Sequence, residues 1–205
     1  MPVYDRKDHL HQLAKREGYR SRAAYKLLEI QTAKRLLGRG QRVVDLGCWP
    51  GGWLQVASRA VGVRGRVVGV DLAEIEPPLN NANVIALCAD FTQPPVGPQI
   101  IAALGGPAEV LLCDAAPKLT GIRATDHARE GTLLEGVEAL LPLLLRPGGS
   151  LLLKILDGPD ALVVDRRLRS QFQTAKTLKP KASRRGSAER YLFGKSYKPS
   201  SPTTP

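Results

Sequence analysis

The chain has 205 residues, 43% of them hydrophobic and 24% charged, which is enough for one core of ordinary domain size. It contains no run of about twenty apolar residues and no apolar secretory leader, so we expect a cytoplasmic protein without a membrane partner. The three cysteines, Cys48, Cys88 and Cys113, are widely spaced inside apolar segments. They predict free buried thiols, not a disulfide framework or a metal site.

The net charge of +11 is unevenly distributed along the chain. Residues 1–42 carry a net charge of +7, residues 43–165 of −6, and residues 166–198 of +10. Two basic segments therefore flank an acidic middle. If the fold brings those segments together, they form a surface for a polyanion, which favours RNA as the partner.

Apolar residues at a spacing near 3.6 predict a helix over 22–37, with Ser21 as its cap and Gly38 to Gly40 at its end. Short apolar runs that end in turn residues predict strands over 43–46, 67–70, 84–87, 110–113 and 150–156, and two late strands are expected near 174–178 and 190–194. Between these strands, further helices are expected over 53–61, 100–104, 128–145 and 161–172, with a loop over 94–98.

Strands that alternate with helices predict an α/β fold with a mostly parallel seven-stranded sheet covered by helices on both faces. We expect one domain over 1–198, including a basic helical extension over about 1–40. The Pro-, Ser- and Thr-rich residues 199–205 are expected to be disordered. In such sheets, ligands bind beyond the carboxyl ends of the strands.

The first strand runs into a glycine-rich turn, Asp45 to Trp53, that lets backbone approach a ligand closely. Asp71 ends the second strand, where an acid meets ribose hydroxyls in nucleotide-binding folds, and Asp90 follows the third. The turn lacks the G-x-G-x-x-G spacing that a dinucleotide pyrophosphate requires. Acids after successive strands suit a cationic ligand better, which favours S-adenosylmethionine over a nicotinamide cofactor.

A lysine stands inside the apolar strand predicted over 150–156. An unpaired ammonium there is costly, so Lys154 implies a nearby anion. Asp114 closes the preceding strand and is the natural partner.

The chain resembles the FtsJ/RrmJ family of ribosomal RNA 2′-O-ribose methyltransferases, which have a Rossmann-like S-adenosylmethionine-dependent fold. The resemblance runs from about Tyr19 to Tyr191. Its matching segments are residues 21–27, 45–53, 114–117, 148–154 and 183–191. Cys48 and Trp49 stand where the family usually has small residues, and Lys118 where it usually has asparagine.

The resemblance implies specific site residues. The family's catalytic tetrad falls on Lys26, Asp114, Lys154 and Glu189, and its donor contacts fall on Gly51, Trp53, Asp71, Asp90 and Asp114, to which Gly47 and Gly52 of the same turn are added. No metal is expected. RNA contacts are predicted for Arg20, Arg22, Lys118, Arg184 and Arg185.

The predicted reaction is methyl transfer to a ribose 2′-hydroxyl, and the resemblance points to a uridine of the large-subunit (23S) ribosomal RNA. We predict that Lys154 either accepts the hydroxyl proton or steers the hydroxyl as a cation, and the sequence leaves both roles open. A monomer that binds RNA but not DNA is expected. The alternatives are another RNA target (transfer RNA or an mRNA cap), an idle RNA-binding assembly factor, and a methyltransferase for a small molecule or protein.

Overall fold

The computed structural model describes residues 9–117, 120–156, 158–184 and 186–199. Its helices are α1 (His9–Arg16), α2 (Ala23–Lys34), α3 (Gly52–Val61), α4 (Val96–Leu104), α5 (Arg123–Leu144) and α6 (Pro159–Ser170). Its strands are β1 (Arg42–Leu46), β2 (Arg66–Asp71), β3 (Val84–Cys88), β4 (Ala108–Cys113), β5 (Leu145–Ile155), β6 (Phe172–Leu178) and β7 (Arg190–Tyr197).

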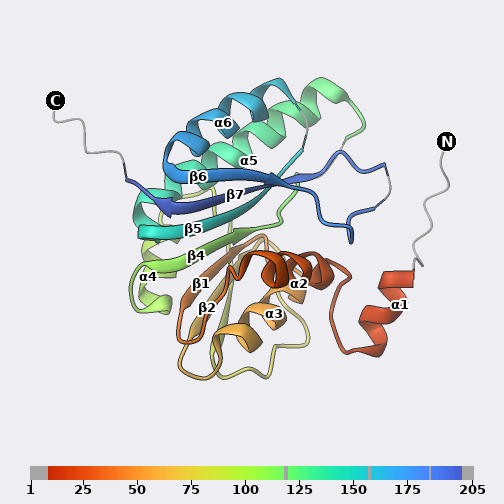
Figure 1. Ribbon diagram of the computed structural model, residues 1–205, viewed down its shortest axis with the longest axis vertical. Coiled ribbons are helices and arrows are strands. Elements are labelled where there is room, and N and C mark those ends of the chain that lie inside the picture. The colour runs from red at the N-terminus through yellow and green to blue at the C-terminus, as the bar shows by residue number, and fades with distance from the viewer. Residues whose placement is uncertain (1–8, 118–119, 157, 185, 200–205) are drawn as a thin grey trace.

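The seven strands form one twisted sheet in the order β3-β2-β1-β4-β5-β7-β6 (Figure 1). Strands β1 to β5 pair in parallel, and β7 runs antiparallel to both of its neighbours, β5 and β6. The predicted α/β fold with a mostly parallel seven-stranded sheet is confirmed. The strand order reverses between β1 and β4, and ligands of such sheets bind where this reversal opens a crevice at the carboxyl ends.

Two apolar clusters cover the two faces of the sheet. One combines strand residues with α4, α5 and α6, and the other combines them with α2 and α3. Figure 1 shows α5 and α6 side by side, and α1 projecting away from the sheet beside α2. None of the helices within the described residues combines the length and the apolar character that a bilayer-spanning segment needs.

Several element boundaries differ from those predicted. Helix α2 starts one residue late and ends at Lys34, where Arg35 adopts the left-handed conformation, and Ser21 does not cap it. Helices α4 and α5 begin earlier than expected, at Val96 and Arg123. The N–H groups in the first turn of a helix have no acceptor within the helix, so a proline there removes no hydrogen bond. Pro98 is therefore tolerated in the first turn of α4.

One of the three thiols is not buried. Cys48 and Cys113 are buried and free, as predicted, but Cys88 is free and exposed. It lies at the end of β3, the strand at the edge of the sheet, whose residues are all exposed or half-buried. The disorder predicted for residues 199–205 concerns mostly residues that lie outside the described part of the chain.

Candidate active site

A cavity of about 850 Å³ opens at the carboxyl ends of the parallel strands. Four of the predicted donor-binding residues line it: Gly47 after β1, Asp71 at the end of β2, Asp90 after β3 and Asp114 after β4. Helix α5 closes the opposite wall with Thr125, Ala128, Arg129, Thr132 and Leu133, and Trp49 lines the same cavity. The order of the strands therefore gathers residues that lie up to 86 positions apart in the sequence.

The acids of this cavity are held by neighbouring backbone groups. Asp71 Oδ2 accepts a hydrogen bond of 2.9 Å from the Trp49 amide, and Asp71 Oδ1 accepts one of 3.0 Å from Ala73. Asp90 Oδ1 accepts bonds from the amide and hydroxyl of Thr92. These bonds fix the direction in which each carboxylate faces the cavity.

The glycine-rich turn approaches its surroundings closely. At Gly47, where φ is +75°, an added Cβ would collide with Ala115. Gly51 also has a positive φ, of 105°, and forms the N-terminal boundary of α3. A side chain at either position would be strained, so the turn requires glycine for its conformation.

Gly51 and Trp53, which the resemblance placed at the donor, and the added Gly52 are not among the residues that line the cavity. An added Cβ at Gly52 would collide with Ser21, so this glycine allows the N-terminal segment to lie against α3. The buried Trp53 ring donates from Nε1 to the Ala23 carbonyl, 2.8 Å away, and thereby joins α3 to the start of α2.

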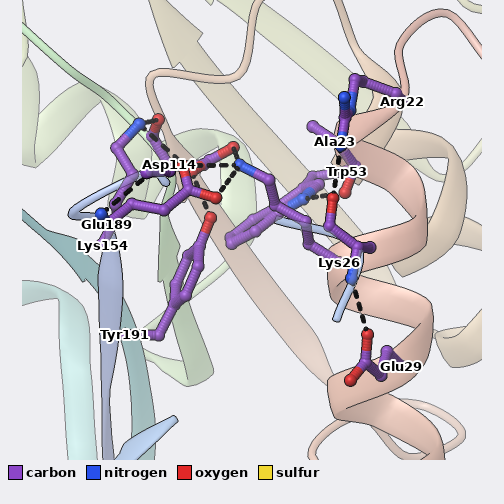
Figure 2. Close-up of polar contacts among 11 residues, drawn as sticks. Arg22, Ala23, Lys26, Glu29, Trp53, Asp114, Lys154, Glu189 and Tyr191 are labelled. Carbon is purple, nitrogen blue, oxygen red and sulfur yellow. Dashed lines mark hydrogen bonds and ion pairs between the residues drawn. The ribbon is translucent and has the colours of Figure 1, made fainter. Parts of the chain in front are cut away.

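Beside the cavity, four charged side chains from four parts of the chain converge (Figure 2). Lys154 Nζ lies 3.2 Å from Asp114 Oδ1 and donates to the Asp114 backbone carbonyl. Lys26 Nζ lies 3.9 Å from Asp114 Oδ2 and 2.9 Å from Glu189 Oε1. The four side chains are only 9–15% exposed, and they comprise two lysines and two acids.

The surroundings of Glu189 lower the pKa of its carboxyl. Burial by itself would raise its pKa, but hydrogen bonding and the adjacent Lys26 ammonium hold the pKa of this carboxyl below its ordinary value. Glu189 is therefore an anion at neutral pH. It lies as a counter-ion beside Lys26, which also faces Asp114.

Tyr191 completes the cluster and was not predicted as a site residue. Its buried hydroxyl donates to Asp114 Oδ1 at 2.7 Å, and its ring lies 5.8 Å from Lys26 Nζ and 6.0 Å from the Trp53 ring. Burial and then the Asp114 carboxylate raise the pKa of Tyr191, so the phenol stays a proton donor. The sequence did offer one signal: Tyr191 ends the last segment that resembles the family.

The cavity suits a cationic nucleoside ligand. Asp71, Asp90 and Asp114 supply three carboxylates, and Gly47 provides a backbone surface without a side chain. Within the described residues, no group of three or more His, Cys, Asp or Glu side chains is arranged to hold a metal ion. The three carboxylates therefore suit a ligand that carries positive charge and hydroxyl groups.

The predicted RNA-contacting arginines have different surroundings. The Arg20 guanidinium bonds to the carbonyls of Pro50, Pro77 and Pro78, and Arg22 Nη2 donates to the Ala182 carbonyl at 2.5 Å. Arg184 is exposed in the segment between β6 and β7. Lys118 and Arg185 lie outside the described residues.

Trp49 and Arg129 are among the cavity residues that were not predicted. Trp49 was noted only as a departure from the family, yet it lines the cavity and is 58% exposed. The exposed Arg129 was placed only in a predicted helix. The spacing of residues 125, 128, 129 and 132 is that of one helical face, but the sequence alone does not show that this face meets the strand ends.

The fold and the site define an α/β enzyme with a ligand cavity at its strand-order reversal and a charged cluster beside it. The sequence matches the FtsJ-like methyltransferase family over residues 19–197. Since this match covers most of the chain, the protein belongs to that family, and it is a methyltransferase.

Relatives and solved structures agree with this membership. The chain is 45% identical to ribosomal RNA large subunit methyltransferase E of Methanothermobacter thermautotrophicus, over 94% of this chain and 91% of that protein. It is 41% identical to the protein of the same name from Pseudomonas aeruginosa, over 91% and 89%. A Plasmodium falciparum protein assigned as a ribosomal RNA methyltransferase superposes with a TM-score of 0.76 at 27% identity, over 87% of this chain and 98% of that one.

A more distant structure shares the fold alone. Aeropyrum pernix fibrillarin, solved with natively bound S-adenosylmethionine, superposes with a TM-score of 0.57 at 17% identity. The match covers 86% of this chain and 75% of fibrillarin.

Proposed function

We propose that this methyltransferase uses S-adenosylmethionine to methylate a ribose 2′-hydroxyl of RNA, with a uridine of the large-subunit ribosomal RNA as the target. One observation carries the proposal: Asp114 both lines the cavity and contacts both lysines of the charged cluster. A donor in the cavity would therefore lie next to the groups that handle the acceptor. The relatives named as large-subunit ribosomal RNA methyltransferases support the choice of substrate.

In the proposed donor site, Asp71 receives the ribose hydroxyls, Asp90 faces the adenine edge, and the Gly47 backbone and Asp114 face the methionine end. When bound, S-adenosylmethionine supplies an electrophilic methyl group next to Asp114. The three carboxylates favour the cationic donor over its neutral product. Opposite charges attract each other more strongly in a partly enclosed cavity than they do in bulk water.

Lys154 is the group proposed to act on the 2′-hydroxyl. Two hydrogen-bond positions of its nitrogen are occupied by the Asp114 side chain and backbone carbonyl. The third position holds either a lone pair that accepts the hydroxyl proton or an N–H that orients the oxygen. Lys26 would hold the sugar or adjacent phosphate while Glu189 and Tyr191 fix Lys26 and Asp114 in place.

The rate of methyl transfer as a function of pH separates these two roles. If the neutral amine is active, the rate at saturating substrate rises with pH and levels off. If the ammonium is active, the rate falls at alkaline pH.

The RNA surface is proposed to join the two basic segments. Glu29 of α2 accepts hydrogen bonds from the amides of Lys181 and Ala182, so the segment before β7 lies against the N-terminal helix. Arg22, Lys118, Arg184 and Arg185 are the cations proposed to meet phosphates there. For this substrate we expect a cytoplasmic monomer.

The test uses radiolabelled S-adenosylmethionine and large ribosomal subunits that lack the modification. After alkaline digestion, label is expected in dinucleotides, because a 2′-O-methyl group blocks cleavage at that linkage. Label in mononucleotides would instead show base methylation and would contradict the proposed reaction. Transfer only to transfer RNA or capped mRNA would retain the reaction and overturn the target.

A further inference from the structure

Arg20 links three segments around the donor cavity. Its Nη1 lies 3.4 Å from the Pro50 carbonyl, and its Nη2 donates to the carbonyls of Pro77 and, at 3.2 Å, Pro78. Pro50 belongs to the turn after β1, whereas Pro77 and Pro78 belong to the loop after β2. The guanidinium therefore bridges the two loops that bound the cavity on this side.

Both of those loops also contribute to the cavity wall. Trp49 precedes Pro50 and lines the cavity, and Leu72 and Ala73 line it at the start of the second loop. Two consecutive prolines have no backbone N–H, so residues 77 and 78 cannot be held by donating to a neighbouring strand. Their carbonyls are the polar groups through which this stretch can be fixed, and Arg20 supplies the donors.

Arg20 is itself held firmly on α3. Its amide donates to Gln55 Oε1 at 2.8 Å, and Gln55 Nε2 donates to the Gly18 carbonyl at 2.8 Å. An added Cβ on Gly51 would lie 3.2 Å from Arg20 Cδ, so the side chain passes directly over the donor turn. A planar guanidinium carries its donors on separate nitrogens, so it can bond to carbonyls that lie further apart than the donors of a single lysine ammonium can reach.

We infer that Arg20 is a positioning residue for the donor site: it fixes the turn at Pro50 against the loop at Pro77–Pro78 and so pre-forms the S-adenosylmethionine cavity. This inference rests on the proposed use of that donor. It gives Arg20 a different role from the phosphate contact that the sequence suggested, because its N–H groups already bond to protein carbonyls.

Calorimetric titration with S-adenosylhomocysteine tests the inference without requiring RNA or turnover. Arg20→Ala should weaken binding about tenfold, since hydrogen bonds from a charged donor organise both loops. Arg20→Lys should fall between that variant and the wild type. Arg64→Ala is the matched control with wild-type affinity, because Arg64 is exposed before β2, at the opposite end of that strand.

Two more measurements separate positioning from RNA binding and from general damage. The KM for the donor should rise in Arg20→Ala while kcat at saturating donor and the affinity for large-subunit RNA stay within about twofold of wild type. If Arg20→Ala does not fold, the change in S-adenosylhomocysteine affinity caused by Arg20→Lys tests the inference instead. An affinity for S-adenosylhomocysteine equal to that of the wild type in a folded Arg20 variant would overturn only the inference. If the wild-type protein itself did not bind S-adenosylhomocysteine, both the inference and the proposed function would be overturned.

Discussion

At the scale of single residues, the hydroxyl of Tyr191 is the least expected part of the site. It donates to the Asp114 oxygen that also faces Lys154. Tyr191→Phe keeps the buried ring and removes only this bond, so Asp114 loses one of its anchors. We expect kcat to fall about tenfold, equivalent to about 1.4 kcal/mol, with little change in donor affinity. An unchanged kcat in steady-state assays would contradict this role.

Asp45 gives a pH-dependent prediction. It is buried on β1, and its two carboxylate oxygens accept no hydrogen bond from the residues that the structure describes. Burial, followed by the Asp114 and Asp71 charges, raises its pKa. The pKa of Asp45 is higher in the folded state than in the unfolded state, where it is about 4. The contribution of Asp45 to stability is therefore greatest below about pH 4, and it is lost as pH rises toward the pKa of the folded state. Asparagine does not ionise, so Asp45→Asn removes this loss of stability at higher pH.

The donor-free Asp45→Asn variant should therefore become progressively more stable than wild type with rising pH, by up to about 1.4 kcal/mol per pH unit. Denaturant unfolding between about pH 5 and pH 8 measures this difference. Exposed Glu74→Gln is the control and should follow the wild-type pH profile. A stability difference for Asp45→Asn that does not change with pH would refute the assignment.

Sequence reasoning succeeded at residues whose chemistry conflicts with their local pattern. Lys154 predicted its own counter-ion because an ammonium inside an apolar strand needs one, and Asp114 is that partner. Tyr191 gave no such conflict, since a tyrosine suits a buried strand without any polar role. Trp49 and Arg129 depend on which loop and which helical face meet across the cavity, information that only the fold supplies.

At the scale of elements, α2 delivers Lys26 and must be held in register with the segment that carries Glu189. Glu29 provides this attachment through the amides of Lys181 and Ala182, at 2.9 and 3.1 Å. Glu29→Ala should lower the free energy of unfolding by about 1 kcal/mol, because two amides lose a charged acceptor.

The same variant should also reduce kcat, since the Lys26–Glu189 pair loses support. Thr32→Ala is a matched control on α2, because the Thr32 hydroxyl bonds only within its helix, to Leu28. Unfolding curves and kcat values for both variants check this expectation. Equal stability and activity in the two variants would show that the Glu29 attachment does not matter.

Prediction of elements succeeded for the apolar strands and was less accurate at helix ends. The buried strands β1, β2 and β4 were found because they are continuous apolar runs. The start of α5 was placed late because residues 123–127 are mostly polar and do not show the apolar spacing of a helix. There, Asp126 accepts bonds from Thr120 and Gly121, and these bonds order the helix start.

At the scale of the whole molecule, the proposed donor cavity is acidic and the proposed RNA surface is basic. The acidic middle of the sequence supplies the cavity acids, and the basic ends lie together through the contacts of Arg22 and Glu29 with residues 181 and 182. RNA affinity should therefore fall steeply with salt, with a slope set by the number of phosphates contacted.

Donor affinity should depend much less on salt, because its contacts lie in a partly enclosed cavity. Arg184→Gln should reduce the slope for RNA binding by about 1. Filter-binding and calorimetry over a series of salt concentrations measure both quantities. A salt-independent RNA affinity would indicate that the basic ends do not form the RNA surface.

The central claim is that the cluster around Lys154 performs methyl transfer beside the donor cavity, and single-turnover kinetics test it most directly. Protein, saturating labelled donor and undermethylated large subunits are mixed for the wild type, Lys154→Ala and the exposed control Arg64→Ala, which lies outside both basic segments. We predict that Lys154→Ala slows transfer about a thousandfold. Its affinities for S-adenosylhomocysteine and RNA should stay near wild type, and Arg64→Ala should react normally. Transfer by Lys154→Ala at the wild-type rate would contradict the account.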